Sequence, residues 1–152
     1  MDLNWVDALL LNAVQKNNRL TSKELAKKVG LSPTACQRRL KRLRNERVIE
    51  ADVSIISPKA IGRAVTMIVL VSLKRERADI VDRFKTTIRN THEVMIGYYI
   101  TGEADFMLVV TARDLEDYEQ FTRRFLYENA EIKALKTMVS MDQVKSSLVI
   151  SV

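Results

Sequence analysis

The sequence has few of the residues from which enzymes build catalytic and metal sites. It contains one cysteine, Cys36, and one histidine, His92, and its four glycines form no Gly-x-Gly-x-x-Gly phosphate loop. A single cysteine excludes an intramolecular disulfide and fits a reducing compartment. Cys36 and His92 are too few for a zinc site without carboxylate ligands, and no set of base and nucleophile accompanies them. We therefore expect no enzyme, no metal and no cofactor.

Long apolar stretches are also missing. The longest uncharged apolar run, residues 64–73, spans ten residues, which is about half of what a membrane-spanning helix requires. The first five residues, Met-Asp-Leu-Asn-Trp, lack the basic start and the small-residue cleavage site of a signal peptide. These absences predict a cytoplasmic protein.

Basic charge is present but unevenly distributed. The chain holds 25 Lys and Arg against 19 Asp and Glu, and residues 1–60 contribute 12 of the basic and 6 of the acidic side chains. The remaining residues hold 13 of each sign, so the whole net charge of +6 lies in the first two fifths of the chain. This asymmetry is expected if one segment meets a polyanion such as nucleic acid and the other does not.

The first fifty residues carry the signals of consecutive helices. Apolar residues at three- and four-residue spacing predict a first helix over residues 3–14, which Asp2 can cap. Thr21 and Glu24 have the spacing of a capping box, in which the hydroxyl and the carboxylate satisfy each other's free backbone donors. A second helix should therefore begin near Ser22.

A third helix follows after a very short turn. Gly30 can supply the left-handed conformation that closes the second helix, and Ser32 and Pro33 are a good cap and first residue for the next, which should run to about Arg47. Two short helices joined by a glycine turn are typical of a helix-turn-helix, whose second helix enters the major groove of double-stranded DNA.

The sides of the third helix can be assigned by a helical wheel. An apolar stripe of Cys36, Leu40 and Leu43 fixes the buried side, and Thr34, Gln37, Arg38 and Lys41 point away from it, toward base edges in a DNA complex. Arg and Gln suit guanine and adenine, while Ser32 and the helix N-terminus suit a phosphate. The predicted DNA-binding residues are Ser22, Ser32, Thr34, Gln37, Arg38, Lys41 and Arg42.

Residues 38–47 include six basic side chains in ten, which in an average protein would be a solvated charged face. Here the turn signature and the segregated charge favour DNA binding. Arg39 lies least toward the DNA side, and we expect it to pair with an acid such as Glu24.

A second module begins after a linker. Residues 48–56 alternate in polarity and predict a linker strand, and the run over 64–73 is typical of a buried strand. The fold class is α+β, a three-helix winged-type helix-turn-helix followed by a ferredoxin-like βαββαβ domain. The expected domains are 1–50, a linker strand and hinge over 51–62, and 63–152. The second domain should contain helices over 78–89 and 114–127 and strands over 64–73, 94–101, 106–112 and 132–144, and residues 148–152 can continue the last strand.

The hairpin at residues 98–105 has two interpretations. It can be an ordinary turn in which glycine serves the backbone and Asp105 ends a strand. Alternatively, Asp105 or Glu103 accepts hydrogen bonds from an ammonium group while free N–H groups around Gly102 hold a carboxylate. Spacing alone leaves both open.

From about Asp7 to Ser147 the chain resembles the Lrp/AsnC family, also called feast/famine regulatory proteins. The resemblance is carried by the stretches Asn18-Arg-Leu-Thr-Ser-x-Glu-Leu-Ala, Val29-Gly-Leu-Ser-Pro-Thr and Thr101-Gly-Glu-Ala-Asp-Phe. It implies a helix-turn-helix, a linker strand and a ferredoxin-like domain of the RAM or ACT type. The family usually has glycine where this chain has Arg47.

What the resemblance implies for function is a homo-oligomer with an effector. Members form dimers through the C-terminal domain, often tetramers or octamers, and commonly bind a small amino acid between dimers. Carried over to this chain, the effector-binding residues are Gly102, Glu103, Asp105, Leu115, Met138, Val139 and Ser140.

The sequence thus predicts a sequence-specific, nucleoid-associated transcription regulator controlled by an amino acid at its C-terminal oligomer interface. The alternative is an architectural protein that wraps DNA by charge and assembly, with no effector. A third hypothesis, a metabolite-binding enzyme or enzyme subunit built on the ferredoxin-like domain, leaves the N-terminal charge unexplained.

Overall fold

The computed structural model describes residues 3–152. The chain forms two compact units, one made of the residues up to Ile55 together with Val144–Val152, the other of Ile56–Gln143. Among the described residues, no helix has both the length and the apolar character needed to cross a membrane. Each unit has a hydrophobic core of its own.

The first unit is a three-helix bundle. Its helices are α1 (Trp5–Lys16), α2 (Ser22–Val29) and α3 (Pro33–Asn45). Each helix contributes apolar side chains at three- and four-residue spacing, so that one face of each is buried against the others. The buried core residues are Leu10, Leu11, Leu25, Val29, Cys36, Leu40 and Leu43.

The start of α1 differs from the prediction. Asp2, the expected cap, lies outside the described residues. Asn4 caps the helix, because its side-chain oxygen accepts the backbone N–H of Asp7 at 3.0 Å while the Asp7 carboxylate accepts the N–H of Asn4 at 3.4 Å. This reciprocal pair makes α1 begin at Trp5 rather than at Leu3.

The predicted turn between α2 and α3 is confirmed. Thr21 and Glu24 form the capping box, with Glu24 N–H donating to Thr21 Oγ1 at 3.2 Å and Thr21 N–H donating to Glu24 Oε2 at 2.7 Å. Gly30 closes α2 in the left-handed region with φ of 71°. Ser32 then caps α3 by accepting the N–H of Ala35 at 3.2 Å.

The turn at the end of α3 forms although Arg47 stands where the resembled family usually has glycine. Arg47 adopts a φ of 55°, and it is the one described residue other than glycine with a positive φ. The N–H of Val48 donates to Leu43 O at 2.8 Å and the N–H of Arg47 donates to Arg44 O at 3.0 Å. These two bonds are those of a Schellman motif, which the arginine completes at a steric cost.

The expected linker strand within 51–62 is not formed in this chain. Its first seven residues carry no strand, and a short 3-10 helix, η1 (Lys59–Ile61), follows. A strand needs a neighbour to satisfy its backbone hydrogen bonds, and none is paired with this segment among the described residues. The alternating pattern leaves Val53, Ile55 and Ile56 more than half exposed, at 69%, 72% and 60%.

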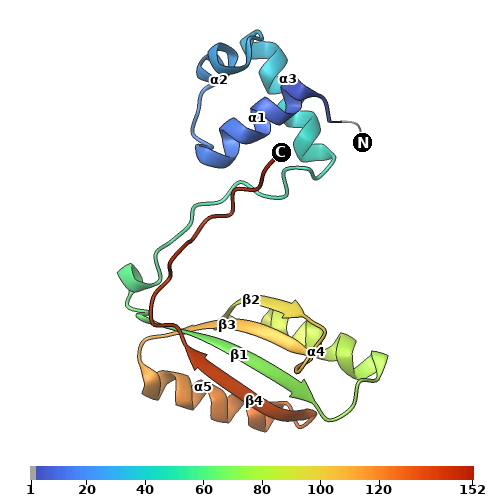
Figure 1. The fold of residues 1–152 in the computed structure, drawn as a ribbon, viewed down its shortest axis with the longest axis vertical. Coiled ribbons are helices and arrows are strands. Elements are labelled where there is room, and N and C mark those ends of the chain that lie inside the picture. Colours follow the sequence, from blue (N-terminus) through green and yellow to red (C-terminus); the bar gives the residue numbers. More distant parts are fainter. Residues whose placement is uncertain (1–2) are drawn as a thin grey trace. The chain divides into compact units, whose positions relative to one another are not determined.

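The second unit has the predicted ferredoxin-like order. The antiparallel sheet has the strand order β2 (Val94–Tyr99), β3 (Phe106–Ala112), β1 (Val65–Leu73) and β4 (Ile132–Val139) (Figure 1). Phe84 of one helix packs on Phe106 of the sheet at 5.0 Å between ring centroids and on Phe125 of the other helix at 6.0 Å, so both helices cover the same face. The elements are β1 (Val65–Leu73), α4 (Ala78–Asn90), β2 (Val94–Tyr99), β3 (Phe106–Ala112), α5 (Leu115–Glu128) and β4 (Ile132–Val139).

The fourth strand is shorter than the predicted 132–144. It ends at Val139, after which the N–H of Ser140 donates to Thr66 O at 2.8 Å. Its partner β1 begins at Val65, so later residues have no neighbouring strand to pair with. The predicted continuation over 148–152 is also wrong, because those residues group with the helical unit.

The face of the sheet turned away from the helices is mostly apolar. In β1, alternate residues from Met67 to Leu73 are buried against the helices, which directs Ile68 and Leu70 to the opposite face. The strand register places side chains of the neighbouring strands beside these two. The apolar residues of this open face are Ile68, Leu70, Ile96, Tyr98, Met107, Val109 and Met138, and Lys136 lies beside Leu70 on the same face.

Candidate functional site

The solvent-facing side of α3 is the one that the helical wheel predicted. Thr34, Gln37, Arg38 and Lys41 are all exposed, whereas the stripe formed by Cys36, Leu40 and Leu43 is buried. Within residues 3–152, neither Arg38 nor Lys41 has an ion-pair partner. Their charges and hydrogen-bond donors are therefore available to another molecule.

Ser32 and Ser22 stand at the first turns of α3 and α2. Ser32 is exposed, and its oxygen already accepts the Ala35 N–H, which leaves its O–H as a donor. Ser22 is half-buried at the first position of its helix. Helix N-termini present free backbone N–H groups, which suit an anionic oxygen.

A buried carboxylate ties α1 to α3. Asp7 is fully buried, and it accepts hydrogen bonds from Arg39 Nη1 at 3.0 Å and from Arg42 Nη2 at 2.6 Å. Arg39 pairs with an acid, as expected, but the acid is Asp7 and not Glu24, which is engaged in the capping box at the start of α2.

Two arginines determine the charge of this carboxylate. Burial alone would raise the pKa of Asp7, but the hydrogen bonds from Arg39, Arg42 and the Asn4 backbone outweigh it and hold the pKa below its ordinary value. Arg42, one of the predicted DNA-binding residues, therefore has one Nη committed to α1, while its side chain stays 42% exposed. Arg39 and Arg42 thus set the position of α3 on α1.

A second ion pair connects the end of α3 to the following segment. The Arg44 guanidinium donates to Asp52 twice, from Nε at 2.7 Å and from Nη2 at 3.0 Å, and Asn18 Nδ2 donates to the same carboxylate at 2.8 Å. The hydrogen bonds from Arg44 lower the pKa of Asp52. Arg44 is thereby occupied within the helical unit.

In the ferredoxin-like unit, the carboxylate of the predicted effector hairpin is already used in the fold. Asp105 is buried and accepts the backbone N–H of Leu73 at 2.7 Å, while its own N–H donates to Val71 O at 2.9 Å. Gly102 has a φ of 124°, a conformation that suits glycine, and is exposed together with Glu103. Asp105 therefore closes the end of β1 as well as the hairpin.

The fold places a further acidic residue, which was not predicted from the sequence, at this hairpin. A hydrogen bond with Asp105, and the charge of that carboxylate, raise the pKa of the exposed Glu76. Two carboxylates so close together repel each other, and a bound cation relieves that repulsion. Glu76 comes soon after β1, and only the fold places it beside Asp105.

One chain does not bring the predicted effector residues together. The hairpin lies beside Val71 and Leu73, near one end of β1. Met138 and Val139 pair with Ile68 and Met67 near the other end, about 15 Å away at 3.4 Å per residue. Leu115, which follows β3, and Ser140, which bonds to Thr66, also belong to this other end.

Both parts of the chain match known domains. Residues 66–150 match the model of the Lrp/AsnC ligand binding domain, and residues 6–50 match the model of a winged helix-turn-helix DNA-binding domain. The first match alone covers more than half of the chain. The chain belongs to the Lrp/AsnC family of transcription regulators.

Individual relatives cover almost the whole length of this Lrp/AsnC protein. An uncharacterized HTH-type transcriptional regulator of Sinorhizobium fredii is 73% identical over 100% of this chain and 90% of its own. The leucine-responsive regulatory protein of Escherichia coli is 29% identical over 96% of this chain and 89% of its own. A transcriptional regulator of Neisseria meningitidis, solved as an L-Met complex, has a TM-score of 0.91 and 26% identity over 98% of this chain and 96% of its own.

These matches confirm the predicted family and fold class. The protein is a transcriptional regulator with a helix-turn-helix DNA-binding domain and an Lrp-type ligand-binding domain, and its relatives are regulators rather than enzymes.

Proposed function

We propose that this Lrp/AsnC protein is a sequence-specific DNA-binding regulator, acting on the nucleoid in the cytoplasm, that reads the major groove with the exposed side of α3. The observation that carries the proposal is the row of exposed side chains on one side of α3, formed by Thr34, Gln37, Arg38 and Lys41 and backed by a buried apolar stripe. An α-helix fits the major groove, and Arg and Gln can form bidentate hydrogen bonds to guanine and adenine.

The phosphate backbone is assigned to a second set of groups. Ser32 and Ser22 offer hydroxyls at helix N-termini, and Arg42 offers the donors that Asp7 does not use. Such contacts fix the position of the helix on the duplex but carry no sequence information. The basic charge of the helical unit therefore supplies affinity, and the exposed row on α3 supplies the choice of sequence.

The regulator should act as a homo-oligomer. The open face of the sheet carries seven large apolar side chains in adjacent strands, and Tyr98 and Met138 among them are 55% and 42% exposed. An apolar patch on this scale marks an interaction surface, and the same face of a second copy is its natural cover. A dimer with two recognition helices would favour a roughly palindromic operator.

The same oligomer would bring the predicted residues of an amino-acid effector site together. Because the hairpin and the end of β4 lie at opposite ends of β1, the two groups of predicted effector residues can share a ligand only if they come from different chains. Asp105 and Glu76 offer carboxylates to an ammonium group, and Gly102 offers exposed backbone to a carboxylate. The solved L-Met complex of the Neisseria meningitidis relative supports an amino acid as the ligand class.

The experiment that tests the DNA proposal is selection of operators from randomised DNA, followed by competition with non-specific DNA at fixed salt. A sequence-specific regulator should bind its selected site at least a thousandfold more tightly than random DNA, within the usual range of about 10³–10⁷. A ratio below about ten would favour the architectural alternative.

The effector is tested by thermal melting against the twenty amino acids. A ligand that binds only the native state at a hundred times its Kd raises the free energy of unfolding by about 2.7 kcal/mol. A responding amino acid should lose its effect in the Glu103→Gln or Asp105→Asn variant. Silence across the panel would contradict the effector proposal and leave the DNA proposal standing.

A further inference from the structure

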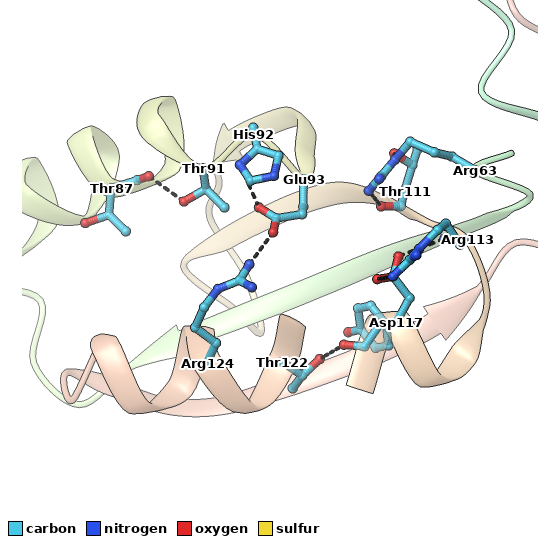
Figure 2. Close-up of polar contacts among 11 residues, drawn as sticks. Arg63, Thr87, Thr91, His92, Glu93, Thr111, Arg113, Asp117, Thr122 and Arg124 are labelled. Carbon is cyan, nitrogen blue, oxygen red and sulfur yellow. Dashed lines mark hydrogen bonds and ion pairs between the residues drawn. The ribbon is translucent and has the colours of Figure 1, made fainter. Parts of the chain in front are cut away.

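Three arginines converge on a cavity of the ferredoxin-like unit at which none of the proposed effector residues lies. The cavity has a volume of about 210 Å³ and opens to solvent between the end of β3, the start of α5 and the turn after α4. Figure 2 shows its two polar sides, with Arg63, Arg113 and Asp117 on one and Glu93, His92 and Arg124 on the other.

On the first side, Arg63 forms no ion pair with any residue of 3–152. Arg63 Nε donates to Thr111 Oγ1 at 2.8 Å, and its Nη2 donates to the backbone carbonyl of the same residue. Both acceptors are neutral, so they orient the guanidinium without neutralising its charge. Beside it, Arg113 Nη2 is 2.9 Å from Asp117 Oδ1, and this partner, with a further contribution from Arg63, lowers the pKa of Asp117 to about 2.

On the second side, the carboxylate of Glu93 contacts two basic side chains. Glu93, whose side chain is 13% exposed, accepts a hydrogen bond from Arg124 Nη2 and lies 3.4 Å from His92 Nδ1. Arg124 remains half exposed, and only one of its five N–H donors is directed at Glu93. Donors on this side are therefore left for a ligand.

The charges of the lining do not cancel. Arg63, Arg113 and Arg124 face the carboxylates of Glu93 and Asp117, which leaves a surplus of one positive charge. The surplus stands out because the chain beyond residue 60 carries 13 charges of each sign. The rest of the lining includes the apolar Val110, Ala112 and Phe121 and the polar Gln120.

We propose that this cavity is a binding site for a small dicarboxylate, with one carboxylate on Arg63 and Arg113 and the other on Arg124 and His92. Guanidinium groups bind carboxylates through paired N–H···O bonds, and arginines on two sides of one cavity match a short carbon chain with an anionic group at each end. The cavity is smaller than the roughly 300–1,000 Å³ of sites for drug-sized ligands, which restricts it to a molecule of a few carbon atoms.

This site is distinct from the proposed amino-acid site. No residue assigned to the amino acid lines the cavity, although Leu115 and Ser140 belong to the same end of β1 as Arg63. A dicarboxylate would therefore be a second chemical input to the regulator, and its binding does not require the amino acid.

The test is isothermal titration calorimetry of the full chain with succinate, glutarate, the monoamide of succinate and inorganic phosphate. We expect succinate or glutarate to bind with a millimolar or tighter Kd, and the monoamide to bind at least tenfold more weakly because it has lost one carboxylate. No binding of either dicarboxylate, or tighter binding of phosphate than of both, would overturn the proposal.

Variants locate the site. Arg63→Gln and Arg124→Gln should each weaken dicarboxylate binding tenfold or more, whereas Arg123→Gln, which removes the adjacent charge on α5 outside the cavity, should not change it. Arg124 is half exposed, so its variant tests the site even if Arg63→Gln does not fold. Unchanged affinity in Arg124→Gln would overturn the assignment. Glu103→Gln should keep dicarboxylate binding, which separates this site from the amino-acid proposal.

Discussion

Replacing Asp7 by asparagine should destabilise the helical unit by roughly 2–3 kcal/mol. The substitution keeps the shape of the side chain and an acceptor for the Asn4 N–H, but it removes the charge that holds Arg39 and Arg42 at 3.0 and 2.6 Å. Each charge-assisted hydrogen bond contributes about 1.5–3 kcal/mol. Because the two arginines are 26% and 42% exposed and can be rehydrated, the loss should stay below the roughly 3–5 kcal/mol of a fully buried pair.

The assay is urea unfolding followed by the fluorescence of Trp5, the only tryptophan, which lies in the helical unit. The control is Lys41→Gln, which removes an exposed charge of α3 with no ion-pair partner within residues 3–152 and should change the free energy of unfolding by less than about 0.5 kcal/mol. A variant at position 7 that unfolds at the same urea concentration as the native chain would refute the idea that this carboxylate holds α3 on α1.

Because of the same carboxylate, the stability of the helical unit should depend on pH. Since folding lowers the pKa of Asp7 below 3.8, its contribution to stability is fully present above the unfolded pKa of 3.8 and is lost as the pH falls below it toward the folded pKa. The native chain should therefore lose more stability than Asp7→Asn between pH 5 and pH 2.5. Parallel acid titrations of the two proteins would contradict this.

Two further predictions concern the same unit. Arg47→Gly should raise the free energy of unfolding by up to about 1 kcal/mol, because glycine adopts the φ of 55° without the steric cost that arginine bears; an unchanged or lower melting temperature would refute that cost. Burial raises the pKa of the Cys36 thiol, so a thiol-specific chromogenic reagent should label it only after unfolding; rapid labelling of the native chain would show that the apolar stripe is open.

The turn between α2 and α3 could be predicted from the sequence because its caps are local, whereas the equally local Asn4–Asp7 capping box of α1 was missed. The Thr21–Glu24 box, the left-handed Gly30 and the Ser32 cap each depend on residues within a few positions of one another. The exposed side of α3 followed from the 3.6-residue period alone. Such features require no knowledge of the tertiary fold.

Features that depend on distant partners could not be predicted. Asp7 and its arginines are 32 and 35 residues apart, so the periodicity gave no reason to prefer it over Glu24 for Arg39. The end of β4 depends on where its partner β1 begins. The predicted linker strand would need a neighbouring strand, and the described residues of one chain provide none. Likewise, the separation of the effector residues along β1 became visible only in the sheet register.

The central claim is that α3 reads bases while the surrounding charge supplies affinity, and operator selection with variants tests it most directly. The native chain, Gln37→Ala, Arg38→Ala and the charge-matched control Arg123→Ala are each used to select sites from randomised DNA. We expect Gln37→Ala and Arg38→Ala each to lose discrimination at one base position, by about 1–3 kcal/mol, and the control to select the native operator. Unchanged preference in both α3 variants would contradict the proposed orientation of the helix.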